Sequence, residues 1–227
     1  MTGDKSSLVS LLIEQQVLRF GDFTLKSGRQ SPYFFNLGAI SSGAAIARLG
    51  AAYADGAGAL GLAFDAVFGP AYKGIPIAVA TAEALSARDR DCGWVFNRKE
   101  RKIHGEGGQF VGAPVSARLL LVDDVLTAGT AVREAAALIG DAGGELVGVL
   151  IALDRQERVV VDEPGTAVAR LQAELGVPVA SLLTLQDVIE YLDLKGGQDN
   201  HLADINSAIR AYQADYCEQV KTADPSV

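Results

Sequence analysis

An unbroken apolar run that ends in two acids, RLLLVDD at residues 118–124, constrains the fold of this chain more than any other segment. A strand without polar alternation is expected where helices cover both faces of a sheet, which is the usual situation of parallel strands. The segments 66–70 and 146–154 have the same apolar character, and stretches with helical spacing of apolar residues lie between them. This alternation predicts an α/β fold with a mostly parallel sheet flanked by helices.

Cap and turn residues divide the rest of the chain into further elements. An amphipathic first helix is expected around Leu8, because Ser6 and Ser7 are good cap residues. A hairpin-like unit is expected over 21–38, where turn residues flank short β-prone runs. The remaining patterns predict strands over 93–97 and 178–184, and helices over 44–53, 75–87, 130–140, 167–175 and once more in the C-terminal tail, with fraying at 222–227.

Length and composition suit one globular domain over residues 1–227, since 49% of the residues are hydrophobic and 21% are charged. The net charge of −8 gives no global attraction to nucleic acid or to an anionic membrane. No secretory signal or membrane span is recognised. The two cysteines match no metal-ligand spacing, and two reduced thiols are the usual case, with a disulfide as the alternative. We expect a cytoplasmic protein with no nucleic-acid partner and no membrane partner.

The most specific motif is LLLVDDVLTAGTA at residues 119–131. An apolar strand ends in Asp123 and Asp124, and a loop of small and hydroxylated residues leads directly into a helix. Backbone N–H groups at a helix N-terminus favour a phosphate, and small side chains let it approach. The acids would repel that phosphate, so we expect them to accept sugar hydroxyls or to partner a Mg²⁺ that neutralises a second phosphate. The alternative is an acidic strand end that caps the next helix.

Two further segments combine positive charge with glycine. The turn GPAYKGIP at 69–76 carries Lys73 at a helix start, where it could hold a pyrophosphate, although a solvated lysine is the alternative. Residues 98–102 hold four cations against one acid, and glycines follow them. This pattern is typical of a basic lid that closes over a diphosphate, with a solvated charge run as the alternative. We expect a mobile lid over residues 98–109.

The motif at 119–131 resembles the phosphoribosyl pyrophosphate (PRPP) signature of the type I phosphoribosyltransferases, which has four apolar residues, two acids, two apolar residues and Thr-Ala-Gly-Thr. Five segments in order, from about residue 20 to about residue 160, resemble the orotate phosphoribosyltransferases in particular. These segments are LKSGRQSPYFFNLG, GPAYKGIP, NRKERKIHGEGG, VDDVLTAGTA and ALDRQER. The resemblance implies a type I phosphoribosyltransferase-like fold with a small N-terminal hood, formed by about residues 20–40 plus part of the C-terminal region, and a flexible catalytic loop over 98–109.

The resemblance also implies an enzyme that joins orotate to the ribose 5-phosphate of PRPP with release of pyrophosphate. The implied catalytic residues are Lys102, Asp123 and Asp124. The implied PRPP ligands are Lys26, Tyr72, Lys73, Arg98, Lys99, Lys102, His104, Asp123, Asp124, Val125, Leu126, Thr127, Ala128, Gly129, Thr130 and Ala131. The implied orotate ligands are Lys26, Phe34, Phe35, Thr127 and Arg155. Mg²⁺ would be the cofactor, with Asp123 and Asp124 acting indirectly through substrate or water, and a homodimer would share the catalytic loop.

The chemistry of orotate is consistent with these roles. Its carboxylate can form paired hydrogen bonds with Arg155, and Phe34 and Phe35 offer apolar surface beside its flat ring. The alternatives are two core phenylalanines and an arginine in a surface ion pair. Positive charge builds on the ribose in the transition state, and Asp123 and Asp124 have the right sign to stabilise it.

Two other functions compete with this hypothesis. A phosphoribosyltransferase for another base, such as uracil or a purine, would have no need of a cation beside a neutral ring. A non-catalytic PRPP-sensing regulator would be expected to carry a DNA-binding region and a degraded lid, and the sequence shows neither. A dinucleotide or P-loop module is disfavoured, because GxGxxG after the first strand and GxxxxGK[ST] are both missing.

Overall fold

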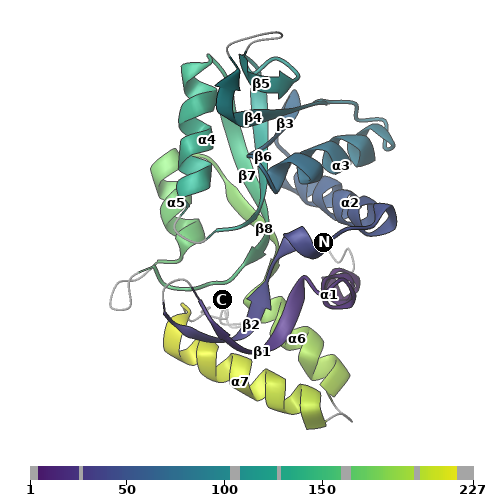
Figure 1. The fold of residues 1–227 in the computed structure, drawn as a ribbon, viewed down its shortest axis with the longest axis vertical. Helices are drawn as coiled ribbons and strands as arrows, with labels where there is room; N and C mark the ends of the chain where they lie inside the picture. The colour runs from purple at the N-terminus through teal and green to yellow at the C-terminus, as the bar shows by residue number, and fades with distance from the viewer. Residues whose placement is uncertain are drawn as a thin grey trace, which may run out of the picture.

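The computed structural model describes residues 5–25, 28–102, 108–126, 129–159, 165–196 and 200–218, and for residues 101 and 102 it describes the backbone alone. A six-stranded sheet with the order β5-β4-β3-β6-β7-β8 forms the centre of the molecule (Figure 1). The strands are β3 (Ala66–Gly69), β4 (Gly93–Lys102), β5 (Gly108–Gly112), β6 (Arg118–Val125), β7 (Glu145–Asp154) and β8 (Val179–Thr184). β5 runs antiparallel to β4, and the other neighbours are parallel, so the predicted mostly parallel sheet is confirmed.

Helices cover both faces of the sheet, as the apolar character of its strands predicts (Figure 1). Side chains of Val132, Ile139 and Leu171 join one face of the strands in a buried cluster. On the other face two helices approach closely at Gly50, where a Cβ would lie 2.4 Å from the carbonyl oxygen of Ala80. The first face carries α4 (Thr130–Asp141) and α5 (Ala167–Leu175), and the second carries α2 (Gly43–Leu60) and α3 (Gly74–Ser86).

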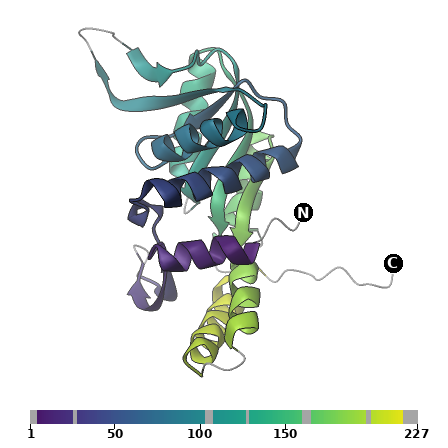
Figure 2. The same ribbon diagram turned by 90° about the vertical axis from the view of Figure 1, so that its right-hand side faces the viewer.

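A smaller unit, which we call the hood, combines the first and the last described elements of the chain (Figures 1 and 2). Its members are α1 (Lys5–Glu14), β1 (Leu18–Thr24), β2 (Gln30–Phe35), α6 (Leu185–Gly196) and α7 (Asn200–Tyr216). β1 and β2 pair antiparallel in a sheet of their own, which confirms the predicted hairpin. α7 packs against β2, where the rings of Tyr33 and Tyr212 meet edge-on with centroids 5.8 Å apart.

Three elements differ from the expectation. Strand β5 was not predicted, because its GQFVG sequence is short and begins and ends with glycine. β4 continues through the charged run to Lys102, since Asn97 pairs with Phe110 and Lys102 with Gly108. The two strands project together from the body of the molecule (Figure 2). The C-terminal region forms the two helices α6 and α7 rather than one.

The ends of the predicted catalytic loop therefore lie in paired strands, while residues 103–107 lie outside the described residues. The mobility of the loop stays a prediction. Within the described ranges, no helix combines the length and the apolar character that crossing a membrane requires.

Candidate active site

The carboxyl ends of four neighbouring strands bring the predicted site residues to one edge of the sheet. β4, β3, β6 and β7 lie side by side in that order and run parallel. Arg98 lies just beyond the part of β4 that pairs with β3, and Lys73 follows β3. Asp124 lies near the end of β6, and Arg155 directly follows β7. Ligands of open α/β sheets collect at this edge, so segments distant in sequence can contribute to one site.

A direct ion pair joins the acidic strand end to the lysine turn. Nζ of Lys73 lies 2.7 Å from Oδ2 of Asp124, which is held in a largely buried position. Oδ1 of Asp124 accepts a hydrogen bond of 2.8 Å from the N–H of Val125, and Oδ1 of Asp123 accepts one of 2.9 Å from the N–H of Asp124. Among the described residues, Oδ2 of Asp123 is therefore the carboxylate oxygen of this pair that has no hydrogen-bond partner.

Asp123 lies in a setting that disfavours its charge. Burial raises the pKa of its carboxyl to about 6, and the negative charge of Asp124 adds to the shift. The N–H of Asp124 and the ammonium of Lys73 oppose it. A buried acid whose pKa is raised by burial and by a second acid marks a candidate functional site.

A buried tyrosine behind the acids was not predicted as part of the site. The hydroxyl of Tyr53, in α2, donates a hydrogen bond of 2.6 Å to the main-chain carbonyl of Asp123. The spacing of Tyr53 from Ile46 and Leu49 places it on the apolar face of the helix and indicates a core residue, and Tyr53 is fully buried. The hydrogen bond to Asp123 could not be predicted from the local sequence, because α2 and β6 are distant along the chain.

The turn after β3 is shaped by two glycines. A Cβ at Gly69 would lie 2.1 Å from the carbonyl oxygen of Gly74, and one at Gly74 would lie 2.6 Å from Cδ of Pro70. Asn97 of β4 accepts a hydrogen bond of 3.1 Å from the N–H of Ala71 through its side-chain oxygen. Backbone packing and a neighbouring strand thus hold this turn, and the side chain of Lys73 extends from it toward Asp124.

The cations of β4 lie beside the same turn. Nζ of Lys99 lies 5.0 Å from the ring centroid of Tyr72, whose side chain is largely exposed. Nε of Arg98 is buried and has no hydrogen-bond partner among the described residues. The structure therefore brings Lys99 beside Tyr72, the neighbour of Lys73, and their binding of a diphosphate stays a prediction. The predicted residues Lys26 and His104, and the side chain of Lys102, lie outside the described residues.

The loop after β6 leads into the N-terminus of α4. Gly129 caps the helix with a φ of 73°, in the left-handed region that suits glycine, and a Cβ there would lie 3.2 Å from the side chain of Arg133. Thr130 and Ala131 are exposed in the first turn, which contains no acid, so its backbone N–H groups can donate hydrogen bonds to an anion. Among the other predicted loop residues, Val125 is half-buried and Leu126 is buried, and two lie outside the described residues, namely Thr127 and Ala128.

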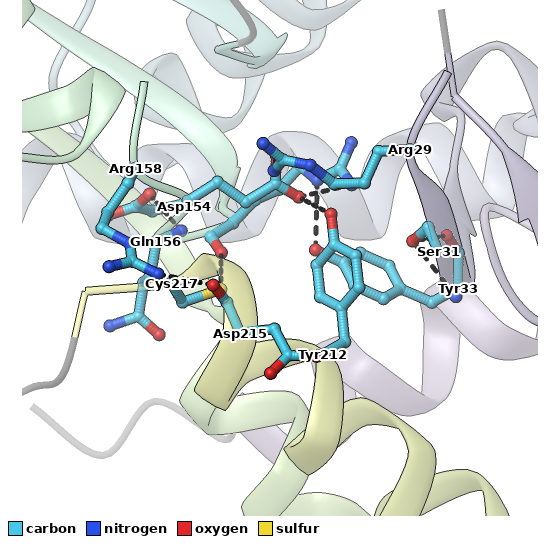
Figure 3. Close-up of polar contacts among 11 residues, drawn as sticks. Arg29, Ser31, Tyr33, Asp154, Gln156, Arg158, Tyr212, Asp215 and Cys217 are labelled. Carbon is cyan, nitrogen blue, oxygen red and sulfur yellow. Dashed lines mark hydrogen bonds and ion pairs between the residues drawn. The ribbon is translucent and has the colours of Figure 1, made fainter. Parts of the chain in front are cut away.

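Arg155, which the resemblance implies as a ligand of the base, contacts residues of the hood. Its Nε donates a hydrogen bond of 3.1 Å to the hydroxyl of Tyr33, and its guanidinium lies over that ring at 5.0 Å from the centroid. Nη2 lies 2.6 Å from Oε1 of Glu157. Tyr33 comes from β2, and Tyr212, whose hydroxyl donates to Oε1 of Glu157, comes from α7. Figure 3 shows the two tyrosine side chains next to each other. Arg155 is thus a partly buried residue with several partners rather than one half of a surface ion pair.

Arg155 stays positively charged, but one of its nitrogens makes no hydrogen bond with a described residue. Burial lowers the pKa of Arg155, yet the neighbouring Tyr33 and Glu157 outweigh burial, so the net shift is upward. Although Nη2 is close to Glu157, the geometry is not that of a hydrogen bond, and this buried nitrogen has no hydrogen-bond partner among the described residues. The carboxylate of Glu157 nevertheless lies directly beside Nη2 and compensates its charge.

The two predicted phenylalanines are packed away from Arg155. Alternation along β2 places Phe34 on the opposite face from Tyr33, where its ring lies 5.5 Å from that of Phe23 and 5.2 Å from the guanidinium of Arg19. Phe35 is 8% exposed and belongs to the main core. The side chain that meets Arg155 is that of Tyr33, which period-two alternation from Phe34 could have indicated.

The acid pair suits Mg²⁺ only when a substrate supplies further ligands. Within the described part of the chain, no three His, Cys, Asp or Glu side chains are grouped as a metal site. Mg²⁺ commonly keeps several waters and uses one or two carboxylates together with substrate phosphates. Asp123 and Asp124 offer that number of carboxylates, so they fit an ion that a diphosphate holds in place.

Comparison with known proteins identifies the family. Residues 39–170 match the family described as Phosphoribosyl transferase domain, and the fold is that of the type I phosphoribosyltransferases. The chain is 52% identical over 213 residues to a protein of Thioalkalivibrio sulfidiphilus named orotate phosphoribosyltransferase, with 93% of this chain and 97% of that protein covered. Within the phosphoribosyltransferases, the chain therefore belongs to the orotate phosphoribosyltransferase family.

Solved structures agree with this assignment. The orotate phosphoribosyltransferase of Francisella tularensis superposes with a TM-score of 0.79 at 35% identity, over 93% of this chain and 100% of that one. The orotate phosphoribosyltransferase of Mycobacterium tuberculosis, solved in complex with PRPP, gives a TM-score of 0.62 at 26% identity, over 81% of this chain and 98% of that one.

Proposed function

We propose that this enzyme transfers the ribose 5-phosphate group of PRPP to orotate, giving orotidine 5′-monophosphate and pyrophosphate in pyrimidine biosynthesis. One observation carries the proposal: the acid pair lies at the end of β6, before the loop that leads into α4, and Arg155 directly follows the adjacent strand β7. This arrangement supports a phosphoribosyl site next to a base site that recognises an anion. The names of the relatives, and the PRPP complex of the Mycobacterium tuberculosis protein, support the same pair of substrates.

The donor PRPP is proposed to lie along the ends of β3, β4 and β6. The loop from Asp123 to Ala131 receives the 5′-phosphate at the N-terminus of α4, with the two carboxylates on the ribose hydroxyls. Tyr72 and Lys73 meet the pyrophosphate. Basic residues of the β4–β5 segment, together with Lys26, complete the pyrophosphate side. Those of the segment are Arg98, Lys99, Lys102 and His104.

Charge separation in the transition state accounts for this arrangement. As the bond to pyrophosphate breaks, positive charge builds on the ribose beside Asp123 and Asp124, and negative charge builds on the leaving group beside Lys73 and the lid cations. Lys102 is proposed as the most rate-critical of these cations. Mg²⁺, held by the diphosphate with indirect help from the acid pair, would neutralise part of the leaving-group charge.

The base is proposed to lie between the end of β7 and the hood. Arg155 forms paired hydrogen bonds with a carboxylate, and Thr127 and Lys26 face the same ring. Because the rings of Phe34 and Phe35 pack elsewhere, their contribution to the base site is proposed to come from the backbone of β2. The homodimer that shares the catalytic loop, and the cytoplasmic location, likewise remain proposals.

An absorbance assay with PRPP, Mg²⁺ and orotate tests the reaction, with uracil, hypoxanthine and adenine in parallel. We expect the absorbance of orotate to change only when both PRPP and Mg²⁺ are present. Turnover of another base, but not of orotate, would support the assignment of the donor site and refute the assignment of orotate as the base. No turnover of any base, together with measurable PRPP binding, would favour the PRPP-sensing alternative.

A further inference from the structure

The base side of the site contains a carboxylate that the proposed roles leave unused. Glu157 lies two residues beyond Arg155, and its side chain is 21% exposed. Its Oε1 lies 2.6 Å from Nη2 of Arg155, and its Oε2 lies 3.4 Å from Nη1 of Arg29. An acid beside a proposed site for an anionic base weakens the local positive potential, so a separate role must account for its position.

Glu157 is held from two elements of the hood. The hydroxyl of Tyr212, in α7, donates a hydrogen bond of 2.6 Å to Oε1, and Arg29, just before β2, pairs with Oε2. The backbone of Glu157 also forms an isolated antiparallel bridge with Cys217. Figure 3 shows Arg29 and Tyr212, which come from the two ends of the chain, in one group of polar contacts. Both carboxylate oxygens and the backbone are therefore fixed.

This fixed carboxylate constrains the guanidinium of Arg155. Tyr33 accepts from Nε, and Glu157 lies at Nη2, so two corners of the planar group are anchored. A guanidinium carries five N–H donors, and among the described residues Nη1 makes no hydrogen bond, so it can donate to a ligand. The two arginines exceed Glu157 by one positive charge, which matches the single negative charge of a monocarboxylate base.

We propose that Glu157 is a positioning residue that orients Arg155 toward the carboxylate of the base. The inference rests on the proposed function and deepens it by including α7 in the base site. Without Glu157, the long Arg155 side chain would regain rotamer freedom, and recognition of the base would weaken. PRPP, which lies at the neighbouring strand end, would be affected much less.

The kinetic test uses Glu157→Gln and Tyr212→Phe, with Tyr216→Phe as the matched control. Tyr216 lies one turn beyond Tyr212 in α7, and its hydroxyl makes no hydrogen bond with any described residue. We expect the KM for orotate to rise about tenfold in Glu157→Gln and about threefold in Tyr212→Phe, as for loss of a charge-assisted contact. The KM for PRPP should stay within about twofold in both variants, and Tyr216→Phe should match the wild type.

A double variant separates positioning from a structural role. If Glu157 acts through Arg155, adding Glu157→Gln to Arg155→Ala should leave the already raised KM for orotate unchanged. The inference is overturned if Glu157→Gln keeps the wild-type KM for orotate, or if its effect adds fully to that of Arg155→Ala. Equal rises in both KM values with a fall in Tm would also overturn it, in favour of a structural role. Failure of the wild type to turn over orotate would instead refute the proposed function, and this inference with it.

Discussion

The hydroxyl of Tyr53 donates a hydrogen bond of 2.6 Å to the main-chain carbonyl of Asp123 and so ties α2 to the acidic end of β6. Burial, together with the nearby Asp123 and Asp124, raises the pKa of Tyr53 well above its usual value, so the phenol stays a neutral donor. The position of the acids therefore depends on the helix layer behind the sheet as well as on their own strand.

Removal of this hydroxyl should lower stability and activity together. In Tyr53→Phe the buried carbonyl of Asp123 loses its donor, which should cost about 1–3 kcal/mol in the free energy of unfolding, measured by urea denaturation. The kcat should fall as well, because the acids shift relative to the loop. Tyr191→Phe is the control, since the hydroxyl of the half-buried Tyr191 makes no hydrogen bond among the described residues. Equal stability of the two variants would contradict this prediction.

The ion pair between Lys73 and Asp124 leads to a prediction about the donor substrate. Lys73→Met should raise the KM for PRPP about tenfold, because a cation that meets the pyrophosphate is lost. The KM for orotate should change less, since Arg155 is untouched. Lys195→Met removes an exposed lysine at the end of α6 and should leave both values unchanged. A larger effect on orotate than on PRPP would argue against the assignment of Lys73.

The close packing of the turn after β3 predicts opposite effects for two glycine substitutions. Gly69→Ala places a Cβ against the carbonyl of Gly74 and should destabilise the protein by about 2–3 kcal/mol, with loss of PRPP turnover. Gly58→Ala, in α2, meets no atom within 4 Å and should stabilise it by about 0.5–1 kcal/mol with normal activity. Thermal unfolding and the absorbance assay check both. A tolerated Gly69→Ala would show that the turn can relax.

The pair of Asp65 and Arg118, at the starts of β3 and β6, predicts a dependence of stability on acid pH. Arg118 donates to Asp65 from its backbone N–H, Nε and Nη2, and these hydrogen bonds lower the pKa of Asp65 to about 2. The unfolded chain has an aspartate pKa of about 3.9, so the contribution is present above that value and is lost as the pH falls toward 2.

The measurement compares the free energy of unfolding of the wild type with that of Asp65→Asn across this range. The wild type should be more stable by a constant amount above about pH 5, and the difference should shrink between about pH 4 and pH 2. Asp55→Asn is a control in which the acid has a single arginine partner on the surface. A difference that does not change with pH would refute a role for the Asp65 charge.

Local sequence pattern was sufficient for the sheet and the donor side of the site. The apolar run of β6, the acids after it and the lysine turn are each contained in one short segment, and parallel pairing necessarily brings such strand ends together. The extension of β4 was not predicted, because charged residues up to Lys102 indicate a loop, whereas pairing with β5 overrides that local preference.

The base side could be predicted only in part. Arg155 was expected, but its partners Tyr33 and Glu157, and the contact of Glu157 with Tyr212, join segments far apart in the sequence. Local sequence patterns do not predict such contacts, since each partner fits the apolar and polar pattern of its own strand or helix. The alternation of β2 does contain one usable signal, because it places Tyr33 and Phe34 on opposite faces.

The hood has a consequence for how substrate preference can change. Tyr33 and Tyr212 lie outside residues 39–170, the part that matches the phosphoribosyl transferase domain, whereas Lys73 and Asp124 lie within it. Arg155 and Glu157 lie within that part as well. The hood therefore surrounds, with side chains from both ends of the chain, an arginine that the phosphoribosyl transferase domain itself carries. Exchange of the terminal segments alone would change the surroundings of Arg155 and leave Arg155, Lys73 and Asp124 in place.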